Sequence, residues 1–201
     1  MQLVSSPTSP FVRSIRVALI ETAQMEDVQL APVVTTALDT DPVAAAANPL
    51  GRIPALIRPE GPTLYDSRVI AQFLNDRAGG GLYPDARRYE TLTLEATAHG
   101  IMEAGVLMVY EHKLRPPEKV FEPWVEAQWE KITRAVAAVN ARWMSHLAGP
   151  LDMSHIALGC ALGYLDFRFA ERNWRKGNDE LDDWFAIFNE RDSMKETMPV
   201  G

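Results

Sequence analysis

Residues 48–67 constrain the fold of this chain more than any other segment. They read Asn-Pro-Leu-Gly-Arg-Ile-Pro-Ala-Leu-Ile-Arg-Pro-Glu-Gly-Pro-Thr-Leu-Tyr-Asp-Ser. Pro54 has no backbone N–H and therefore suits the first residue of a strand, which Ala55-Leu56-Ile57 continues as a short apolar run. Pro59-Glu60-Gly61-Pro62 is typical of a tight turn, and Thr63-Leu64-Tyr65 is predicted to pair back on the first strand.

A helix is predicted to begin where this hairpin ends. Asp66 and Ser67 offer side chains that cap a helix N-terminus, and the apolar residues that follow them recur at helical spacing (Val69, Ile70, Phe73 and Leu74). The first N–H groups of a helix have no partner within the helix, so they attract carboxylates and other anions. The segment therefore predicts a place beside a strand edge that binds a small peptide or a carboxylate.

The residues before this segment alternate between strand and helix patterns. Residues 2–5 and 28–34 read as strands, and Pro32 favours an edge position for the second strand. Ser9-Pro10 predicts the start of one helix, and Asp41-Pro42 the start of a weaker one. The order strand, helix, strand, helix, hairpin, helix is typical of a thioredoxin-like α/β domain.

The remainder of the chain reads as helices only. A glycine-rich linker over 78–84 precedes predicted helical segments at 85–114, 118–147, 156–169 and 181–189. We expect a thioredoxin-like domain at residues 1–78 and an all-helical domain at residues 85–201. Asp152 is the expected N-cap of the third helical segment, which is strongly apolar.

Composition limits the class of protein and its partners. The chain has 201 residues, of which 47% are apolar and 23% charged, as in an ordinary soluble globular protein. No apolar run is long enough to cross a bilayer, and the N-terminus lacks the features of a secretory signal. A single cysteine, Cys160, fits a reducing cytoplasm. The net charge of −7 argues against nucleic-acid binding.

Two motifs resemble those of the cytosolic glutathione transferases. Asn48-Pro49-x-Gly51-Arg52-Ile53-Pro54 followed by Asp66-Ser67 is similar to the family's glutathione-binding segment, Asn-Pro-x-Gly-Lys-Val-Pro and then Glu-Ser or Asp-Ser. Thr8-Ser9-Pro10-Phe11-Val12-Arg13 lies where the family carries its activating residue. The resemblance covers nearly the whole chain, and the bacterial, serine-type members are the most similar. It says little about the second substrate.

The resemblance implies that Ser9 activates the glutathione thiol. A hydroxyl at this helix start can donate a hydrogen bond to the sulfur and favour its thiolate form. Omega-like members of the family have a cysteine before this proline, which forms mixed disulfides, and Ser9 cannot do so. Ser9 alone would read as an ordinary helix cap, and the nearby Ser5, Ser6 and Thr8 are alternative donors.

The resemblance also implies how glutathione is held. The family keeps the bond before Pro54 cis, so that the Ile53 backbone pairs with the cysteinyl part of glutathione. Ser67 would hold the γ-glutamyl carboxylate and Asp66 its ammonium group. Arg52 would reach the glycyl carboxylate or, equally, remain in solvent.

The helical part carries weaker candidates. Met102, Glu103 and Tyr110, with Met108, would face the cleft of a transferase and line an electrophile pocket, although ordinary core packing explains the apolar ones equally well. The histidines at 99, 112, 146 and 155 lack metal-ligand spacing, so we expect helix-surface residues and no metal. Cys160 reads as an inert core thiol. The family's capping box is altered to Asp152 and His155, which predicts a weakened box.

Together these features predict a cytoplasmic glutathione transferase with a role in detoxification. Reduced glutathione would be the cosubstrate, and its thiolate would attack a small hydrophobic electrophile held by the helical domain. The resemblance implies a two-fold homodimer in which each N-terminal domain packs on the partner's helical domain. The alternatives are a non-catalytic binding or regulatory protein of the same fold and, less favoured, a thiol-disulfide exchange enzyme.

Overall fold

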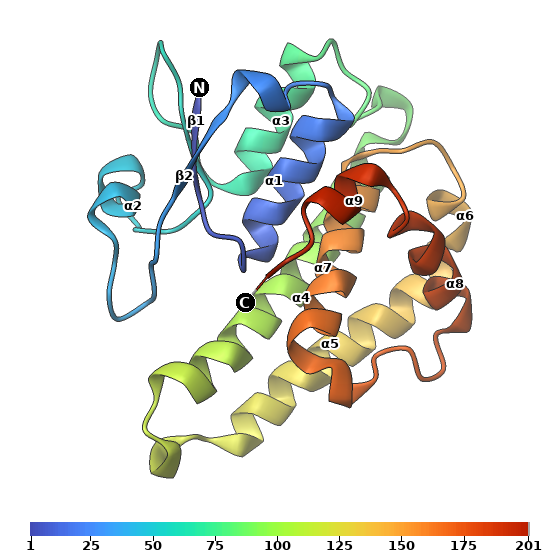
Figure 1. The fold of residues 1–201 in the computed structure, drawn as a ribbon. Coiled ribbons are helices and arrows are strands. Elements are labelled where there is room, and N and C mark those ends of the chain that lie inside the picture. The colour runs from blue at the N-terminus through green and yellow to red at the C-terminus, as the bar shows by residue number, and fades with distance from the viewer. Residues whose placement is uncertain (201) are drawn as a thin grey trace. The chain divides into compact units, whose positions relative to one another are not determined.

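The structure is a computed structural model in which residues 1–200 are described, and it divides into two compact units. The first unit comprises Met1–Arg88 and the segment that begins at Asp192, and the second comprises Tyr89–Arg191. Figure 1 shows the helices and strands of both units. Within residues 1–200, no helix combines the length and apolarity that crossing a membrane requires.

A three-stranded sheet is the centre of the first unit. Its strands are β1 (Gln2–Ser5), β2 (Gln29–Pro32) and β3 (Ala55–Ile57), in the order β2-β1-β3. β1 runs parallel to β2 and antiparallel to β3. The return of the predicted hairpin forms only a single bridge, between Leu56 and Leu64, because Pro62 and the turn before it leave few residues for pairing. The expected thioredoxin-like α/β arrangement is confirmed.

Helices cover both faces of this sheet. α1 (Pro10–Glu21) and α3 (Ser67–Arg77) lie side by side on one face, and α2 (Pro42–Ala47) lies on the other (Figure 1). A short 3-10 turn, Met25–Asp27, precedes β2. Alternate residues of a strand point to opposite faces, so Val4 and Ala55 pack with small residues of α2 (Ala44 and Ala47).

The C-terminal segment belongs to the first unit because α1 holds it. The short helix α9 (Asp192–Glu196) accepts a hydrogen bond from the buried Arg13 side chain, whose Nη2 lies 3.0 Å from the Met194 carbonyl. The Ser193 hydroxyl donates to the Glu21 carboxylate. The helical range predicted at 85–201 therefore differs from the observed unit, which ends at Arg191. A pattern of apolar residues does not show on which neighbour a five-residue helix packs.

The second unit is entirely helical. Its helices are α4 (Arg88–Leu114), α5 (Glu122–Arg142), α6 (Met144–Leu147), α7 (Met153–Phe169) and α8 (Asp179–Phe188), with 3-10 turns at Pro117–Lys119 and Ala170–Arg172. A further 3-10 turn, Asp85–Arg87, precedes α4 at the end of the first unit. The segment predicted as one helix over 118–147 is interrupted at Trp143, where α5 ends. α7 is buried on most of its surface, and Cys160 within it is fully buried, as expected of a core thiol.

Candidate functional site

The loop between α2 and β3 is shaped by the Asn48 side chain. Its Nδ2 donates to the Arg52 carbonyl at 2.9 Å, and its Oδ1 accepts from the Leu50 N–H at 3.0 Å. Gly51 has a φ of +63°, and a Cβ at this position would lie 2.4 Å from Thr40 Cγ2. Glycine is therefore required here both for its backbone conformation and for space. These contacts explain the Asn-Pro-x-Gly spacing.

The Ile53–Pro54 peptide bond is cis, as the family resemblance implied. Pro54 is buried at the entry to β3, and the Ile53 side chain packs on the cluster around Val4. Neither the N–H nor the C=O of Ile53 has a hydrogen-bond partner within residues 1–200. This half-buried residue thus presents an unpaired backbone edge. Arg52 before it is exposed and forms no ion pair with any described residue.

Asp66 and Ser67 begin α3, as predicted. The Asp66 carboxylate caps the helix by accepting from the Arg68 N–H at 3.1 Å and also pairs with the Arg68 guanidinium at 3.0 Å. The peptide bond between Tyr65 and Asp66 is a second cis bond. Ser67 is only 3% exposed, yet its hydroxyl makes no hydrogen bond to any of residues 1–200. Its oxygen is not fully buried, so a group from outside the chain can reach it.

Ser9 is the N-cap of α1, with Pro10 in the first turn. Its Oγ accepts a hydrogen bond from the Val12 N–H at 3.3 Å, and accepting leaves its own hydrogen available. The competing hydroxyls are engaged. Ser5 donates to the Ala31 carbonyl at 3.4 Å, and the Ser6 and Thr8 oxygens lie 3.3 Å apart. One hydroxyl of the Ser6–Thr8 pair also keeps its hydrogen, but of these four residues Ser9 is the one that caps a helix N-terminus.

The strand register brings these parts to the same end of the sheet. Val4 pairs with Ala55, so the chain that leaves β1 toward Ser9 runs past Pro54 and Ile53. Leu56 pairs with Leu64, two residues before Asp66, so the chain that leads to α3 also passes β3. The strands therefore bring to β3 the chain segments that lead to Ser9 and to Asp66. The sequence motif predicted these residues, and the sheet explains their proximity.

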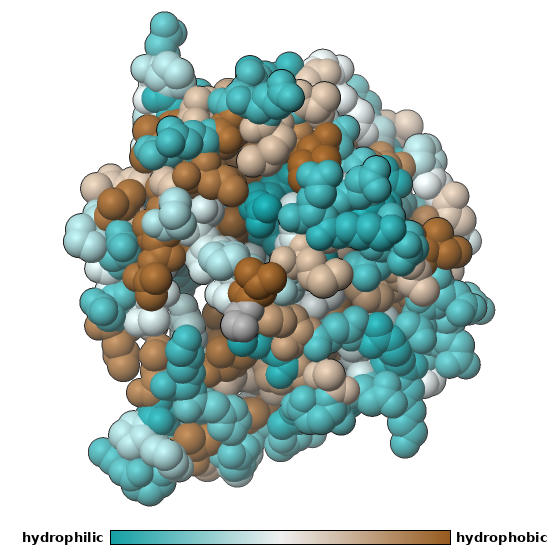
Figure 2. Space-filling model, in the orientation of Figure 1, coloured by the Kyte–Doolittle hydropathy of each residue, from teal (hydrophilic) through white to brown (hydrophobic). Residues whose placement is uncertain are grey.

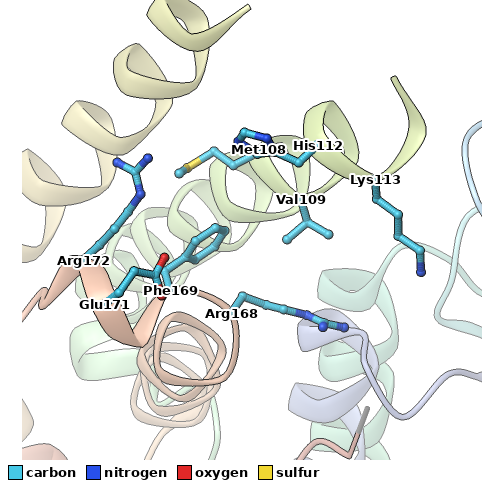
Figure 3. Close-up of a pocket in the computed structure, with 8 residues that line it drawn as sticks. All are labelled: Met108, Val109, His112, Lys113, Arg168, Phe169, Glu171 and Arg172. Atoms are coloured by element: carbon cyan, nitrogen blue, oxygen red, sulfur yellow. The ribbon is translucent and has the colours of Figure 1, made fainter. Parts of the chain in front are cut away.

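The three residues expected to line an electrophile pocket lie on α4 but differ in their exposure to solvent. Met102 is fully buried in the core, Glu103 is exposed and Tyr110 is half-buried. A cavity of about 360 Å³ lies between the C-terminal parts of α4 and α7, and none of these three residues lines it. Its lining consists of Met108, Val109, His112, Lys113, Arg168, Phe169, Glu171 and Arg172 (Figure 3). Helical periodicity alone did not reveal this cavity, because its walls are about sixty residues apart in sequence.

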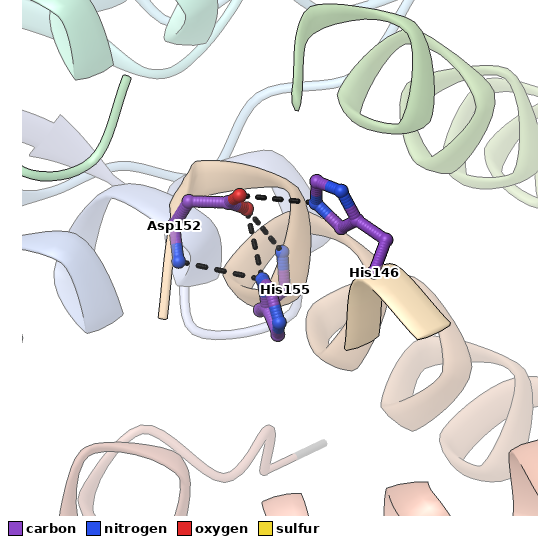
Figure 4. A group of neighbouring side chains, drawn as sticks. All are labelled: His146, Asp152 and His155. Atoms are coloured by element: carbon purple, nitrogen blue, oxygen red, sulfur yellow. Dashed lines mark hydrogen bonds and ion pairs between the residues drawn. The ribbon is translucent and has the colours of Figure 1, made fainter. Parts of the chain in front are cut away.

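The prediction that the histidines are surface residues is wrong for His99 and His155, which are buried. His146 is also largely covered, whereas His112 is exposed. α6 and the start of α7 bring His146 and His155 to the buried Asp152, and possible metal-ligand atoms of the three residues lie within 4.8 Å of one another (Figure 4). Sequence spacing missed this cluster because a turn joins the two helices.

Asp152 is already surrounded by hydrogen-bond donors. Its carboxylate accepts from the Thr91 hydroxyl at 3.0 Å, the Ser154 hydroxyl at 2.5 Å and the Ser154 N–H at 3.0 Å. Burial alone would raise the pKa of Asp152, but the hydrogen bonds from His155 and Ser154 outweigh it and hold the pKa far below its ordinary value. An ionised, fully hydrogen-bonded helix cap accounts for this cluster.

Both contacts of the capping box of α7 are present as distances, although histidine replaces the family's usual acid. His155 Nδ1 lies 2.8 Å from an Asp152 carboxylate oxygen and 3.3 Å from the Asp152 backbone nitrogen. One ring nitrogen cannot donate and accept at once, and the shorter contact to a charged acceptor places the hydrogen on Nδ1. The imidazole therefore donates to the Asp152 carboxylate, and the second contact of the box, from the Asp152 N–H, is the weaker one. His155 Nε2 is buried without a hydrogen-bond partner among residues 1–200.

Comparison with known proteins agrees with this architecture. The family model of the glutathione S-transferase N-terminal domain matches residues 3–81, and that of the C-terminal domain matches residues 122–186. The uncharacterized GST-like protein YibF of Escherichia coli K12 is 31% identical over 205 residues, which cover 99% of this chain and 98% of YibF.

Solved structures show the same similarity in three dimensions. A glutathione transferase family member from Pseudomonas fluorescens Pf-5 with bound glutathione is 41% identical, with a TM-score of 0.97 over 100% of this chain and 99% of the other. A Methylobacillus flagellatus KT glutathione S-transferase with bound glutathione is 32% identical, with a TM-score of 0.82 over 99% of both chains. The matches span both units, and this chain is a member of the glutathione S-transferase family.

Proposed function

We propose that this protein binds reduced glutathione in its first unit and activates the thiol for attack on a small hydrophobic electrophile. The observation that carries the proposal is the hydrogen bonding of Ser9. Its oxygen accepts from the Val12 N–H, and its own hydrogen remains available to a ligand. A donor at a helix N-terminus stabilises a thiolate by a hydrogen bond and by the positive end of the helix dipole.

The other motif residues provide contacts for the rest of the tripeptide. The unpaired Ile53 backbone would hydrogen-bond the cysteinyl residue as a short strand addition. The buried Ser67 hydroxyl and its N–H at the start of α3 would hold the γ-glutamyl carboxylate, and Asp66 its ammonium group. Arg52 would pair with the glycyl carboxylate. Glutathione is the cosubstrate in this scheme, which calls for no metal.

The proposed reaction forms one sulfur–carbon bond. The thiol gives up its proton to solvent as the Ser9 hydrogen bond stabilises the thiolate, and the sulfur lone pair attacks the electrophilic carbon. In a substitution, the leaving group departs with the electron pair of its bond. In an addition to a double bond, the neighbouring carbon takes up a proton. No bond forms between glutathione and the protein, because serine and not cysteine precedes Pro10.

Relatives with known ligands support this proposal. One structure of a Pseudomonas fluorescens Pf-5 family member contains glutathione, and another contains S-(propanoic acid)-glutathione. The protein in the second structure is 41% identical to this chain, with a TM-score of 0.92 over 100% of both chains. The second ligand is a glutathione thioether, which is the kind of product that thiolate attack gives. We further propose that the protein is a homodimer, located in the cytoplasm, with the helical unit as its substrate domain.

Calorimetric titration with reduced glutathione tests the first part of the proposal. The thiolate absorbance of the bound ligand then reports its thiol pKa, which we expect to lie below that of free glutathione. Conjugation is measured with an aryl halide and an α,β-unsaturated acid. Binding without a lowered thiol pKa or turnover would favour a non-catalytic binding protein. Absence of binding would overturn the proposal.

A further inference from the structure

The cavity between α4 and α7 combines an apolar wall with cationic side chains. The aromatic ring of Phe169 forms part of the wall and is fixed by Trp129 and Tyr164, with ring centroids 6.0 and 6.5 Å away. Met108 and Val109 from α4 complete the apolar part (Figure 3). A volume of about 360 Å³ is sufficient for a small organic molecule.

Not all of the cations around the cavity are neutralised by a carboxylate. Arg172 makes a bidentate pair with Glu126, at 2.7 and 3.1 Å, and His112 lies 4.0 Å from Glu122. Lys113 and Arg168, by contrast, have no carboxylate within ion-pair distance among residues 1–200. Both side chains reach toward the same side of the cavity in Figure 3.

Arg168 is held in place by neutral groups, one of which is the Tyr164 phenol that accepts a hydrogen bond from it. Its guanidinium carbon lies 4.0 Å from the centre of the Phe167 ring, which fixes the planar group by a cation–π contact. Its Nε is buried without a hydrogen-bond partner in the described part of the chain. Burial raises the pKa of the neighbouring Tyr164 to about 12, so this phenol stays neutral and supplies no negative charge. Among the described residues that line the cavity, Glu171 is the only acid, and it is exposed.

We propose that this cavity is a binding site for a small apolar carboxylate. Arg168 holds the carboxylate, because a guanidinium matches its planar geometry with parallel hydrogen bonds. Lys113 adds positive charge, and the apolar body of the ligand packs on Met108, Val109 and Phe169. Since every residue of the site belongs to the helical unit, binding of the acid does not depend on glutathione binding in the first unit.

Calorimetry with phenylacetate and phenylacetamide tests this assignment on the full chain. The two probes have nearly the same shape and differ in charge. We expect phenylacetate to bind at least about ten-fold more tightly, because only the carboxylate forms charge-assisted hydrogen bonds. Arg168→Gln should weaken phenylacetate binding by about ten-fold and Lys113→Gln by less, while both leave phenylacetamide binding unchanged. Saturating glutathione should not displace the probe.

The control variant is Arg134→Gln, which removes an exposed cation of α5 that pairs only loosely with Glu130 at 3.8 Å. It should bind phenylacetate as tightly as the parent protein does. This result would show that the loss of affinity in Arg168→Gln comes from a lost contact in the cavity and not from the change in net charge. Val109→Trp places a large ring in the cavity and should abolish binding even if Arg168→Gln fails to fold. Equal affinity for the acid and the amide, or full phenylacetate binding by Val109→Trp, would overturn the proposal. Glutathione titration of the same samples reports the proposed function separately.

Discussion

Ser9 has two proposed roles at the start of α1, as a helix cap and as a hydrogen-bond donor to glutathione, and its geometry is compatible with both. As a cap it accepts the Val12 N–H, and as the proposed activating group it donates its hydrogen to the sulfur of glutathione. A hydroxyl can accept and donate at the same time, so neither role excludes the other. Substitution should therefore change stability and reactivity by different amounts.

Replacement of Ser9 by alanine should lower the free energy of unfolding by only about 1 kcal/mol, the usual value of a lost N-cap. The conjugation rate should fall by about ten-fold or more, because the thiol of bound glutathione loses a donor and its pKa rises. Urea unfolding and steady-state rates measure the two effects. Thr8→Ala, which removes a hydroxyl that is already paired with Ser6, is the control. A Ser9→Ala protein with the parental rate would reduce Ser9 to a cap.

Ser67 offers a second test at the scale of single residues. Its buried hydroxyl has no acceptor or donor among residues 1–200, so Ser67→Ala should hardly alter the fold. Glutathione affinity should fall by roughly 1–3 kcal/mol, the usual contribution of a hydrogen bond to a charged group. Calorimetry checks the value, with Thr63→Ala in the same hairpin as the control. Unchanged affinity would place the γ-glutamyl carboxylate elsewhere.

At the scale of elements, the start of α7 shows how one buried charge organises a helix. Asp152 accepts hydrogen bonds from α7 itself, from His146 on α6 and from Thr91 on α4. The carboxylate thereby joins three helices within the second unit. His155 stabilises this helix start by a different bond from that of an acid, because its Nδ1–H donates to the Asp152 carboxylate.

Asp152→Asn should destabilise the protein by about 3 kcal/mol or more at pH 7, because several donors lose a charged acceptor in a buried site. The pKa of Asp152 is lower in the folded than in the unfolded state. Its stabilisation is therefore complete above the unfolded pKa of about 4 and is lost as the pH falls toward the folded pKa. Urea unfolding should thus show the difference between variant and parent shrinking below about pH 4. The control is Asp183→Asn, at an exposed position of α8. A difference that does not depend on pH would contradict this account.

For the whole molecule, the proposed homodimer can be tested at an exposed apolar surface of the first unit. Val34, Leu38 and Leu50, in the loops on either side of α2, are 88%, 76% and 70% exposed. Brown residues gather in this region on the left of Figure 2. Burial of such side chains would favour association by the hydrophobic effect.

Sedimentation of the parent at micromolar concentration should show a dimer. Leu50→Glu should shift it toward monomer, because the charge would lose its water at the contact. Ile187→Glu on α8, which changes an equally exposed apolar residue of the other unit, should leave the dimer intact. A parent that sediments only as a monomer would count against the dimer. A dimer unchanged by Leu50→Glu would place the interface elsewhere.

Local chemistry explains what the sequence by itself determined. The caps Ser9, Asp41, Asp66 and Asp152, the glycine at 51 and the entry to β3 at Pro54 each follow from the residue and its immediate neighbours. The order of strands and helices follows from periodicity. These local rules were enough to predict the α/β and helical regions, whereas the residues proposed to bind glutathione followed from the resemblance of two motifs to those of the glutathione transferases.

Other features were decided only by tertiary structure, because they depend on residues that are distant along the chain. The segment after Arg191 joins the first unit through Arg13, and a turn between two helices brings His146 and His155 to Asp152. The cavity that holds Arg168 and Lys113 forms where the ends of α4 and α7 meet. Residue type and spacing do not show which distant residues come into contact, since burial and pairing arise only when the helices have packed.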